Sequence, residues 1–253
     1  MATFALIHGG AHGGWCWEEL VPELEARGHV AVAPDLPIED ESAGALAWAE
    51  TVVAALPPGA DDVVVVGHSL GGMAVPVVAT LVPVRHLVFL AAMVPMPGMA
   101  YADYLATQPD AISFSMDAGG ESWDPEASRT LAPEAAGGAS VPWAAARAGF
   151  YHDVPEDVAR RAFERLRPQA MTVFTERCPL ETWPDVASTY VLMTEDRAVD
   201  QGWSRRVATE RLGATVVELG GGHSPFYSRP VELAETLDRI AAGRPFARGQ
   251  RRS

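Results

Sequence analysis

The run VVVVGHSLGG at positions 63–72 constrains the fold of this chain more than any other segment. Four consecutive valines predict a strand that is buried on both faces. The G-x-S-x-G pattern that follows is typical of a sharp turn from a strand into a helix, where the serine hydroxyl projects into the open and the glycines allow close backbone contact. The pattern could also mark a plain glycine turn, so Ser69 is a candidate nucleophile only if catalytic partners lie nearby.

Short β-rich runs alternate with helical patterns over most of the chain. This alternation predicts an α/β fold with a mostly parallel sheet of about six strands and flanking helices. We expect strands at 3–7, 30–33, 63–66, 86–90, 189–193 and 215–219. We expect helices at 15–27, 42–56 with Ser42 as the N-cap, from 70 onward, 156–167, 203–212 and 231–242.

A serine hydroxyl needs a base, and His223 is the best candidate in this sequence. It follows the last expected strand, so its loop can reach the sheet edge at which Ser69 emerges. His68 adjoins Ser69, but neighbouring side chains diverge at a tight turn, and we interpret it as structural. His29 and His86 stand at strand starts, and His152 lies in a different segment.

The imidazole in turn needs an acid that fixes its tautomer. Asp196 directly follows the strand at 189–193 and should lie at the same edge of the sheet. Asp200 is the alternative, although it is farther from the strand end, and Glu195 should face elsewhere. The order Ser69, Asp196, His223 is the order expected of an α/β-hydrolase.

The glycine-rich loop after the first strand, His8 to Gly14, can supply oxyanion donors. Leu70 at the helix start offers one backbone amide, and Gly10 offers the second. We interpret His8 and His12 mainly as scaffolding of this loop, and keep His12 as a candidate substrate-binding residue.

Composition excludes several classes of function. The net charge of −14 argues against nucleic-acid and anionic-membrane partners. All 19 basic residues are arginine, so lysine-based catalysis and the P-loop lysine are excluded. Two cysteines, Cys16 and Cys178, cannot form a disulfide framework, and no metal-ligand spacing is visible. We expect no cofactor, no metal and, without a signal-like or membrane-spanning run, a cytoplasmic location.

Residues 94–185 interrupt the regular pattern and contain ten of the twenty aromatic side chains. We expect an inserted cap here, with a hydrolase core at 1–93 and 186–242 and a disordered tail at 243–253. The candidate substrate-binding aromatics are Trp123, Trp143, Phe150 and Tyr151. We expect Trp143 and Tyr151 to be the better candidates, and the alternative is that these aromatics only form the cap's own small core.

The chain resembles the α/β-hydrolases over its full length, and in particular the plant methylesterase and hydroxynitrile lyase group with its bacterial esterase relatives. The matching segments are IHGGAHGGWCW at 7–17, GHSLGG at 67–72, TEDR at 194–197 and GGHSPF at 221–226. The resemblance implies Ser69 as nucleophile, His223 as base, Asp196 as its orienting acid, and the amides of Gly10 and Leu70 as oxyanion hole. It also implies that the inserted segment is the cap.

Two departures bear on the reaction. Lyase members have a threonine where this chain has Gly9, and a lysine where it has Ser224. We therefore predict a serine esterase that cleaves a small carboxylic ester through an acyl-enzyme. The alternatives are a carbon–carbon lyase and a non-catalytic binding member of the fold. The expected partner is a small-molecule ester; the oligomeric state is open, with a homodimer as one alternative.

Overall fold

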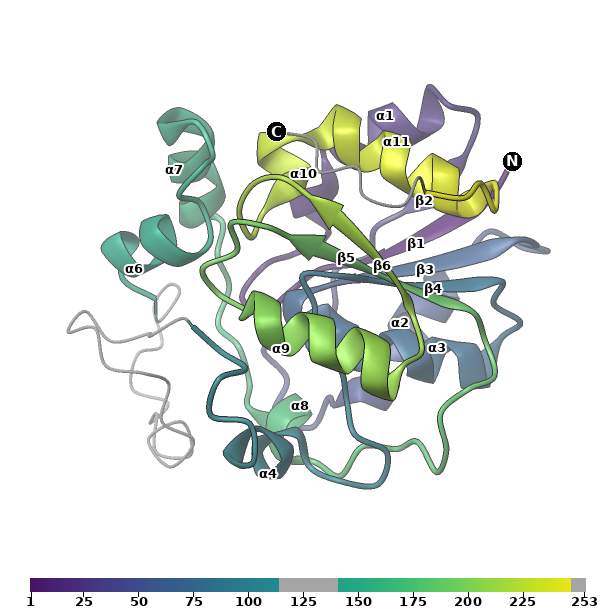
Figure 1. The fold of residues 1–253 in the computed structure, drawn as a ribbon, viewed down its shortest axis with the longest axis horizontal. Coiled ribbons are helices and arrows are strands. Elements are labelled where there is room, and N and C mark those ends of the chain that lie inside the picture. Colours follow the sequence, from purple (N-terminus) through teal and green to yellow (C-terminus); the bar gives the residue numbers. More distant parts are fainter. Residues whose placement is uncertain (114–140, 247–253) are drawn as a thin grey trace.

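A computed structural model describes residues 1–113 and 141–246 of the chain. Within these ranges six strands form a single sheet in the order β2-β1-β3-β4-β5-β6, and every neighbouring pair is parallel (Figure 1). The strands are β1 (Thr3–Ile7), β2 (Val30–Val32), β3 (Val63–His68), β4 (His86–Leu90), β5 (Ser188–Met193) and β6 (Thr215–Leu219). The predicted α/β fold and its six-stranded parallel sheet are confirmed.

Helices cover both faces of the sheet (Figure 1). One layer contains α1 (Leu20–Glu25), α10 (Pro225–Ser228) and α11 (Pro230–Ala241), and the other contains α2 (Ala45–Ala55), α3 (Val75–Leu81) and α9 (Gln201–Arg206). Side chains of β3 alternate between the layers, with Val64 and Val66 on the first and Val63 and Val65 on the second. Because both faces are buried, the strand is a continuous valine run.

Three expected helices are interrupted in the structure. The helix expected at 15–27 is a 3₁₀ helix, η1 (Gly14–Trp17), followed by α1, whose first turn accommodates Pro22 because no intrahelical N–H is needed there. The helix expected from Leu70 is likewise a 3₁₀ helix, η2 (Ser69–Met73), and then α3, with Pro76 in its first turn. The helix expected at 203–212 comprises α9 and a π-helical turn, η4 (Val207–Arg211).

The expected N-cap at Ser42 is wrong. The α2 helix begins at Ala45 with Gly44 as N-cap, and Ser42 bonds locally to Asp40 instead. The Ala45 amide donates to Glu176 Oε1 at 2.5 Å, so a carboxylate from a distant segment stabilises this helix start.

The segment between β4 and β5 contains the residues expected to form the cap. Its described helices are α4 (Tyr101–Ala106), α6 (Trp143–Gly149), α7 (Glu156–Glu164) and α8 (Thr172–Thr175). The α6 and α7 helices lie together beyond the carboxyl edge of the sheet, and the α4 and α8 helices form a second pair, apart from the first (Figure 1).

No helix of residues 1–113 and 141–246 is long and apolar enough to cross a membrane.

The first residues of the tail that we expected to be disordered contact the α11 helix. The Arg244 amide donates to the Arg239 carbonyl, and the Arg244 side chain pairs with Asp238. Arg239 also lies 4.8 Å from the centre of the Phe246 ring. The α11 helix thus supplies partners for residues 243–246, which composition alone did not reveal; residues 247–253 lie outside the described ranges.

Candidate active site

Ser69 lies where β3 ends, in a strained backbone conformation. Its φ of 50° is in the left-handed region, which costs a non-glycine residue about 1–3 kcal/mol. Its carbonyl accepts a hydrogen bond from the Met93 amide at 2.9 Å. A Cβ atom on Gly67 would come within 2.2 Å of the Val75 side chain, so the turn requires glycine there. The sharp turn from a strand into a helix that the motif predicted is therefore present, with Ser69 half-buried in it.

His223 and Asp196 form a buried pair. The His223 Nδ1 atom lies 3.0 Å from both carboxylate oxygens, and the side chains are 2% and 3% exposed. The Asp196 carboxylate also accepts the amides of Ala198 and Val199, which fix its orientation. With Nδ1–H donating to the carboxylate, Nε2 is the nitrogen that can accept a proton.

The structure pairs His223 with Asp196 and uses the alternative acid elsewhere. Asp200 is the N-cap of α9, and its carboxylate accepts the Trp203 amide at 2.7 Å. Glu195 is exposed. Capping explains why an aspartate stands at 200 without any role in the candidate active site.

His68 links the turn at 67–72, here called the serine turn, to the loop at 220–224 that carries His223, here called the histidine loop. Its Nε2 lies 2.9 Å from the His223 carbonyl oxygen, and because a carbonyl only accepts, Nε2 carries the proton. The two imidazole rings lie 4.6 Å apart. Burial holds the pKa of His68 well below its usual value, so the ring is neutral. The structural interpretation of His68 agrees with these contacts.

The two candidate oxyanion donors come from adjacent segments. A Cβ atom on Gly10 would lie 3.2 Å from Leu70 Cδ2, and one on Gly9 would lie 3.0 Å from Ser69 Cβ. Residues 8–12, here called the oxyanion loop, therefore contact the serine turn directly. This contact arises because β1 and β3 are neighbours, while the chain between them runs out to β2.

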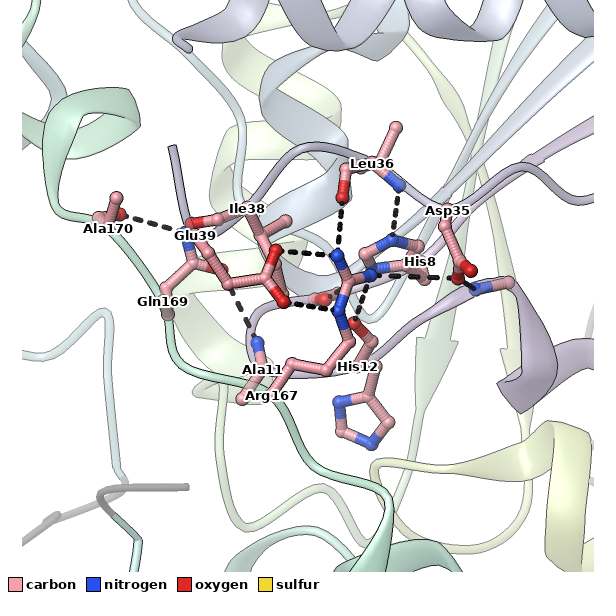
Figure 2. Close-up of polar contacts among 12 residues, drawn as sticks. His8, Ala11, His12, Asp35, Leu36, Ile38, Glu39, Arg167, Gln169 and Ala170 are labelled. Carbon is pink, nitrogen blue, oxygen red and sulfur yellow. Dashed lines mark hydrogen bonds and ion pairs between the residues drawn. The ribbon is translucent and has the colours of Figure 1, made fainter. Parts of the chain in front are cut away.

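His8 fixes the peptide that carries the Gly10 amide. The Leu36 amide donates to His8 Nε2 at 3.0 Å, which leaves the ring proton on Nδ1, and Nδ1 donates to the Gly9 carbonyl at 2.8 Å (Figure 2). That carbonyl and the Gly10 N–H belong to one peptide plane. Burial lowers the pKa of His8 to about 4, so the tautomer persists at neutral pH.

His12 joins the oxyanion loop to the cap. Its Nδ1 donates to the Gly10 carbonyl at 2.8 Å, and its Nε2 accepts from the Tyr151 hydroxyl, also at 2.8 Å. Burial lowers its pKa to about 4. Both ring nitrogens are thus bound to protein groups, which supports the interpretation of His12 as scaffolding of the loop; contact of His12 with substrate stays a prediction.

The candidate cap aromatics differ from one another in their surroundings. Phe150 is the aromatic next to the candidate base, with its ring centre 5.7 Å from that of His223. Trp143, a preferred candidate, packs 5.3 Å from Phe163 and 4.0 Å below the Arg160 guanidinium, so it belongs to the cap's own packing. Tyr151 is fully buried and bonded to the oxyanion loop, and Trp123 lies outside the described residues.

Three consecutive cap residues, 151–153, each bond to a different loop of the site. The Tyr151 hydroxyl donates to His12 in the oxyanion loop. His152 Nε2 donates to the Glu195 carbonyl at 2.9 Å, in the loop of the acid. Asp153 accepts the Gly222 amide at 2.8 Å, in the histidine loop. Sequence reasoning missed these contacts because no motif marks them.

Two further cap residues, Arg167 and Gln169, were also missed. Both lie against the oxyanion loop, and their side chains reach residues 35–39 as well (Figure 2). Arginine and glutamine on an irregular segment carry no sequence signal of such a role.

In the described part of the chain, no group of three histidine, cysteine or acidic residues could hold a metal ion.

Comparisons with known proteins place these features in a family. The chain is 28% identical to norfluorocurarine synthase 1 from Strychnos over 94% of each sequence, and 29% identical to the probable esterase PIR7A from Oryza sativa subsp. indica over 94% of this chain and 96% of the relative. The fold is similar to that of an extracellular alpha/beta-hydrolase from a Paenibacillus species, with a TM-score of 0.77 and 23% identity over 95% of this chain and 99% of that one. Residues 4–236 match the profile of the Alpha/beta hydrolase family, and the chain belongs to this family.

Proposed function

We propose that the chain is a cofactor-independent serine hydrolase that cleaves a small carboxylic ester through an acyl-enzyme. One observation carries the proposal: the buried His223–Asp196 pair is joined through His68 to the strained turn that presents Ser69. Such a pair gives a neighbouring hydroxyl its general base.

In the proposed mechanism, Ser69 Oγ attacks the ester carbonyl carbon while His223 Nε2 takes the hydroxyl proton. The amides of Gly10 and Leu70 donate to the oxyanion of the tetrahedral intermediate, each contributing about 3–4 kcal/mol of barrier lowering. His223 then protonates the departing alcohol. Water, activated by the same imidazole, hydrolyses the acyl-enzyme and regenerates Ser69.

The comparisons support ester hydrolysis, since a relative covering nearly the whole chain is named a probable esterase. The geometry argues against the lyase alternative. A Cβ atom at Gly9 would lie 2.8 Å from His68 Nδ1, so the lyase threonine does not fit this backbone without a shift. The lysine of the lyases is replaced by Ser224, which is fully buried.

The proposal is tested with a fluorophosphonate probe and p-nitrophenyl esters of increasing chain length. We expect wild type to be labelled and to hydrolyse short esters, and Ser69→Ala to lose labelling and several orders of magnitude of kcat/KM. Ser42→Ala is the control, because Ser42 is exposed and bonds only to Asp40. Labelling that persists in Ser69→Ala would refute the assignment, and an unlabelled, inactive wild type would support a non-catalytic binder.

A further inference from the structure

The cap segment at 166–170 contacts the oxyanion loop and bonds to both the backbone N–H and the backbone C=O of Ala11. The Arg167 amide donates to the Ala11 carbonyl at 2.7 Å, and the Ala11 amide donates to Gln169 Oε1 at 3.3 Å (Figure 2). Both backbone polar groups of Ala11 therefore have cap residues as partners.

Ala11 needs this support because its backbone is strained. Its φ is 59°, in the left-handed region that a residue with a Cβ rarely adopts. Such a conformation persists only where surrounding contacts hold it. Ala11 directly follows Gly10, so a relaxation of Ala11 to an ordinary φ would rotate the chain beside the candidate oxyanion donor.

The Gln169 side chain is itself held in place. Its Nε2 donates to the Ala170 carbonyl at 2.8 Å and points at the Ile38 carbonyl at 3.5 Å. Its Oε1 lies 3.5 Å from the position that a Cβ atom on Gly10 would occupy. The carboxamide therefore lies beside the donor residue and is oriented by bonds on its other side.

The Arg167 side chain adds a second set of bonds to the same region. Its Nε and Nη2 donate to the two oxygens of Glu39 at 2.7 and 2.6 Å, in the two-point geometry that arginine favours. Its Nη2 also reaches the Leu36 carbonyl at 3.0 Å, and its Nη1 reaches the His12 carbonyl at 3.5 Å. Arg167 thus connects the cap, the oxyanion loop and the segment at 35–39.

We propose that Gln169 and Arg167 are positioning residues that hold the oxyanion loop in its catalytic shape from the cap. The inference rests on the proposed function, because the oxyanion that the loop would stabilise is that of the proposed acyl transfer. Neither side chain need touch substrate. Gln169 acts through Ala11, and the Arg167 side chain acts through the His12 carbonyl and the segment at 35–39. Both effects therefore belong to the transition state, in which the oxyanion forms, more than to the bound ester.

The test compares Gln169→Leu with Gln108→Leu. Within the described residues, the Gln108 side chain donates to the carbonyl and hydroxyl of the adjacent Thr107, far from the oxyanion loop in sequence, so Gln108→Leu controls for the loss of a carboxamide. With p-nitrophenyl acetate we expect Gln169→Leu to lower kcat by about 10- to 100-fold, the range that a misplaced catalytic group produces, while KM changes by less than about threefold. The affinity for an alkyl trifluoromethyl ketone, which forms an oxyanion on the active-site serine, should fall by the same factor as kcat. Gln108→Leu should match wild type in all three measurements.

A second pair of variants covers a failure of Gln169→Leu to fold. Arg167→Lys keeps the backbone bond to Ala11 and the positive charge but loses the two-point bond to Glu39. Arg165→Lys is its control, since Arg165 also pairs with a carboxylate, Glu18, without contacting the oxyanion loop. We expect Arg167→Lys to lower kcat and ketone affinity together, and Arg165→Lys to change neither.

The outcomes separate this inference from the proposed function. If wild type hydrolyses the ester but Gln169→Leu and Arg167→Lys lose only melting temperature, with kcat and ketone affinity unchanged, the two residues are structural and the inference is wrong. If wild type neither hydrolyses esters nor reacts with fluorophosphonate, the proposed function fails and the inference fails with it.

Discussion

At the scale of single residues, the Asp196 carboxylate combines two tasks. It accepts the His223 Nδ1–H and, on Oδ1, the amides of Ala198 and Val199. The backbone amides of Ala198 and Val199 can only donate hydrogen bonds. In an Asp196→Asn variant, the side-chain NH₂ would therefore face these two donors unless it turned toward the imidazole of His223. In that orientation the NH₂ would donate to Nδ1 and force the ring proton onto Nε2, where the base needs a lone pair.

Asp196→Asn should therefore lower kcat by about 10⁴-fold while the protein stays folded. Steady-state hydrolysis of p-nitrophenyl acetate and a melting curve measure both quantities. The control is Asp200→Asn, because asparagine caps a helix about as well as aspartate does, so kcat and melting temperature should both stay near wild type. A larger loss of kcat in Asp200→Asn would mean that the orienting acid is wrongly assigned.

At the scale of secondary-structure elements, the strands were predictable and the cap contacts were not. Parallel strands place their carboxyl ends at one edge, so the β-rich runs that precede Ser69, Asp196 and His223 already predict that all three lie at this edge. No comparable rule predicts which residues the irregular segments of the cap contact. Arg167 bonds to Glu39, a residue 128 positions earlier, and only the folded path of an irregular segment reveals that pair.

The end of α6 shows how one turn decides which aromatic faces the site. Trp143 begins α6 and packs on α7, while Phe150, the residue after the helix, contacts the His223 ring. The sequence interpretation preferred Trp143 and Tyr151 because they bracket a short segment beside a clear helix. Their spacing along the chain does not show which way each side chain points.

Phe150→Ala should shift the kcat/KM ratio between acetate and octanoate p-nitrophenyl esters by about 1–3 kcal/mol, the usual contribution of a few methylenes in an apolar pocket. Trp143→Ala should lower the melting temperature and leave this ratio unchanged, because its partners are Phe163 and Arg160. An altered ratio in Trp143→Ala with a constant ratio in Phe150→Ala would place the acyl pocket elsewhere.

At the scale of the whole molecule, three buried neutral histidines make folding sensitive to acid. Burial lowers the pKa of His8 and of His12 to about 4, and it holds the pKa of His68 well below its usual value. The unfolded chain binds protons on these rings near pH 6.5, whereas the folded chain does not. Stability from these rings is thus fully present above about pH 6.5 and is lost as the pH falls toward 4.

The melting temperature of wild type should therefore fall steadily between pH 6.5 and 4, with each ring contributing about 1.4 kcal/mol per pH unit. His12→Gln should melt lower than wild type at pH 7.5, because it loses the bonds to Gly10 and Tyr151, but its decline with acid should be shallower. Thermal melts at four pH values suffice to compare the slopes. Parallel curves for the two proteins would show that His12 is not a neutral buried group.

The bonds from residues 151–153 to three separate loops bear on protein engineering. Replacing the segment between β4 and β5, the expected cap, with that of a relative is an obvious route to new specificity, because this segment is continuous in the chain. Such a chimera would leave His12, the Glu195 carbonyl and the Gly222 amide facing foreign side chains. An exchangeable unit therefore includes the cap, these three loops and the segment at 35–39 that Arg167 and Gln169 contact, and a library built on cap replacement should vary these segments jointly.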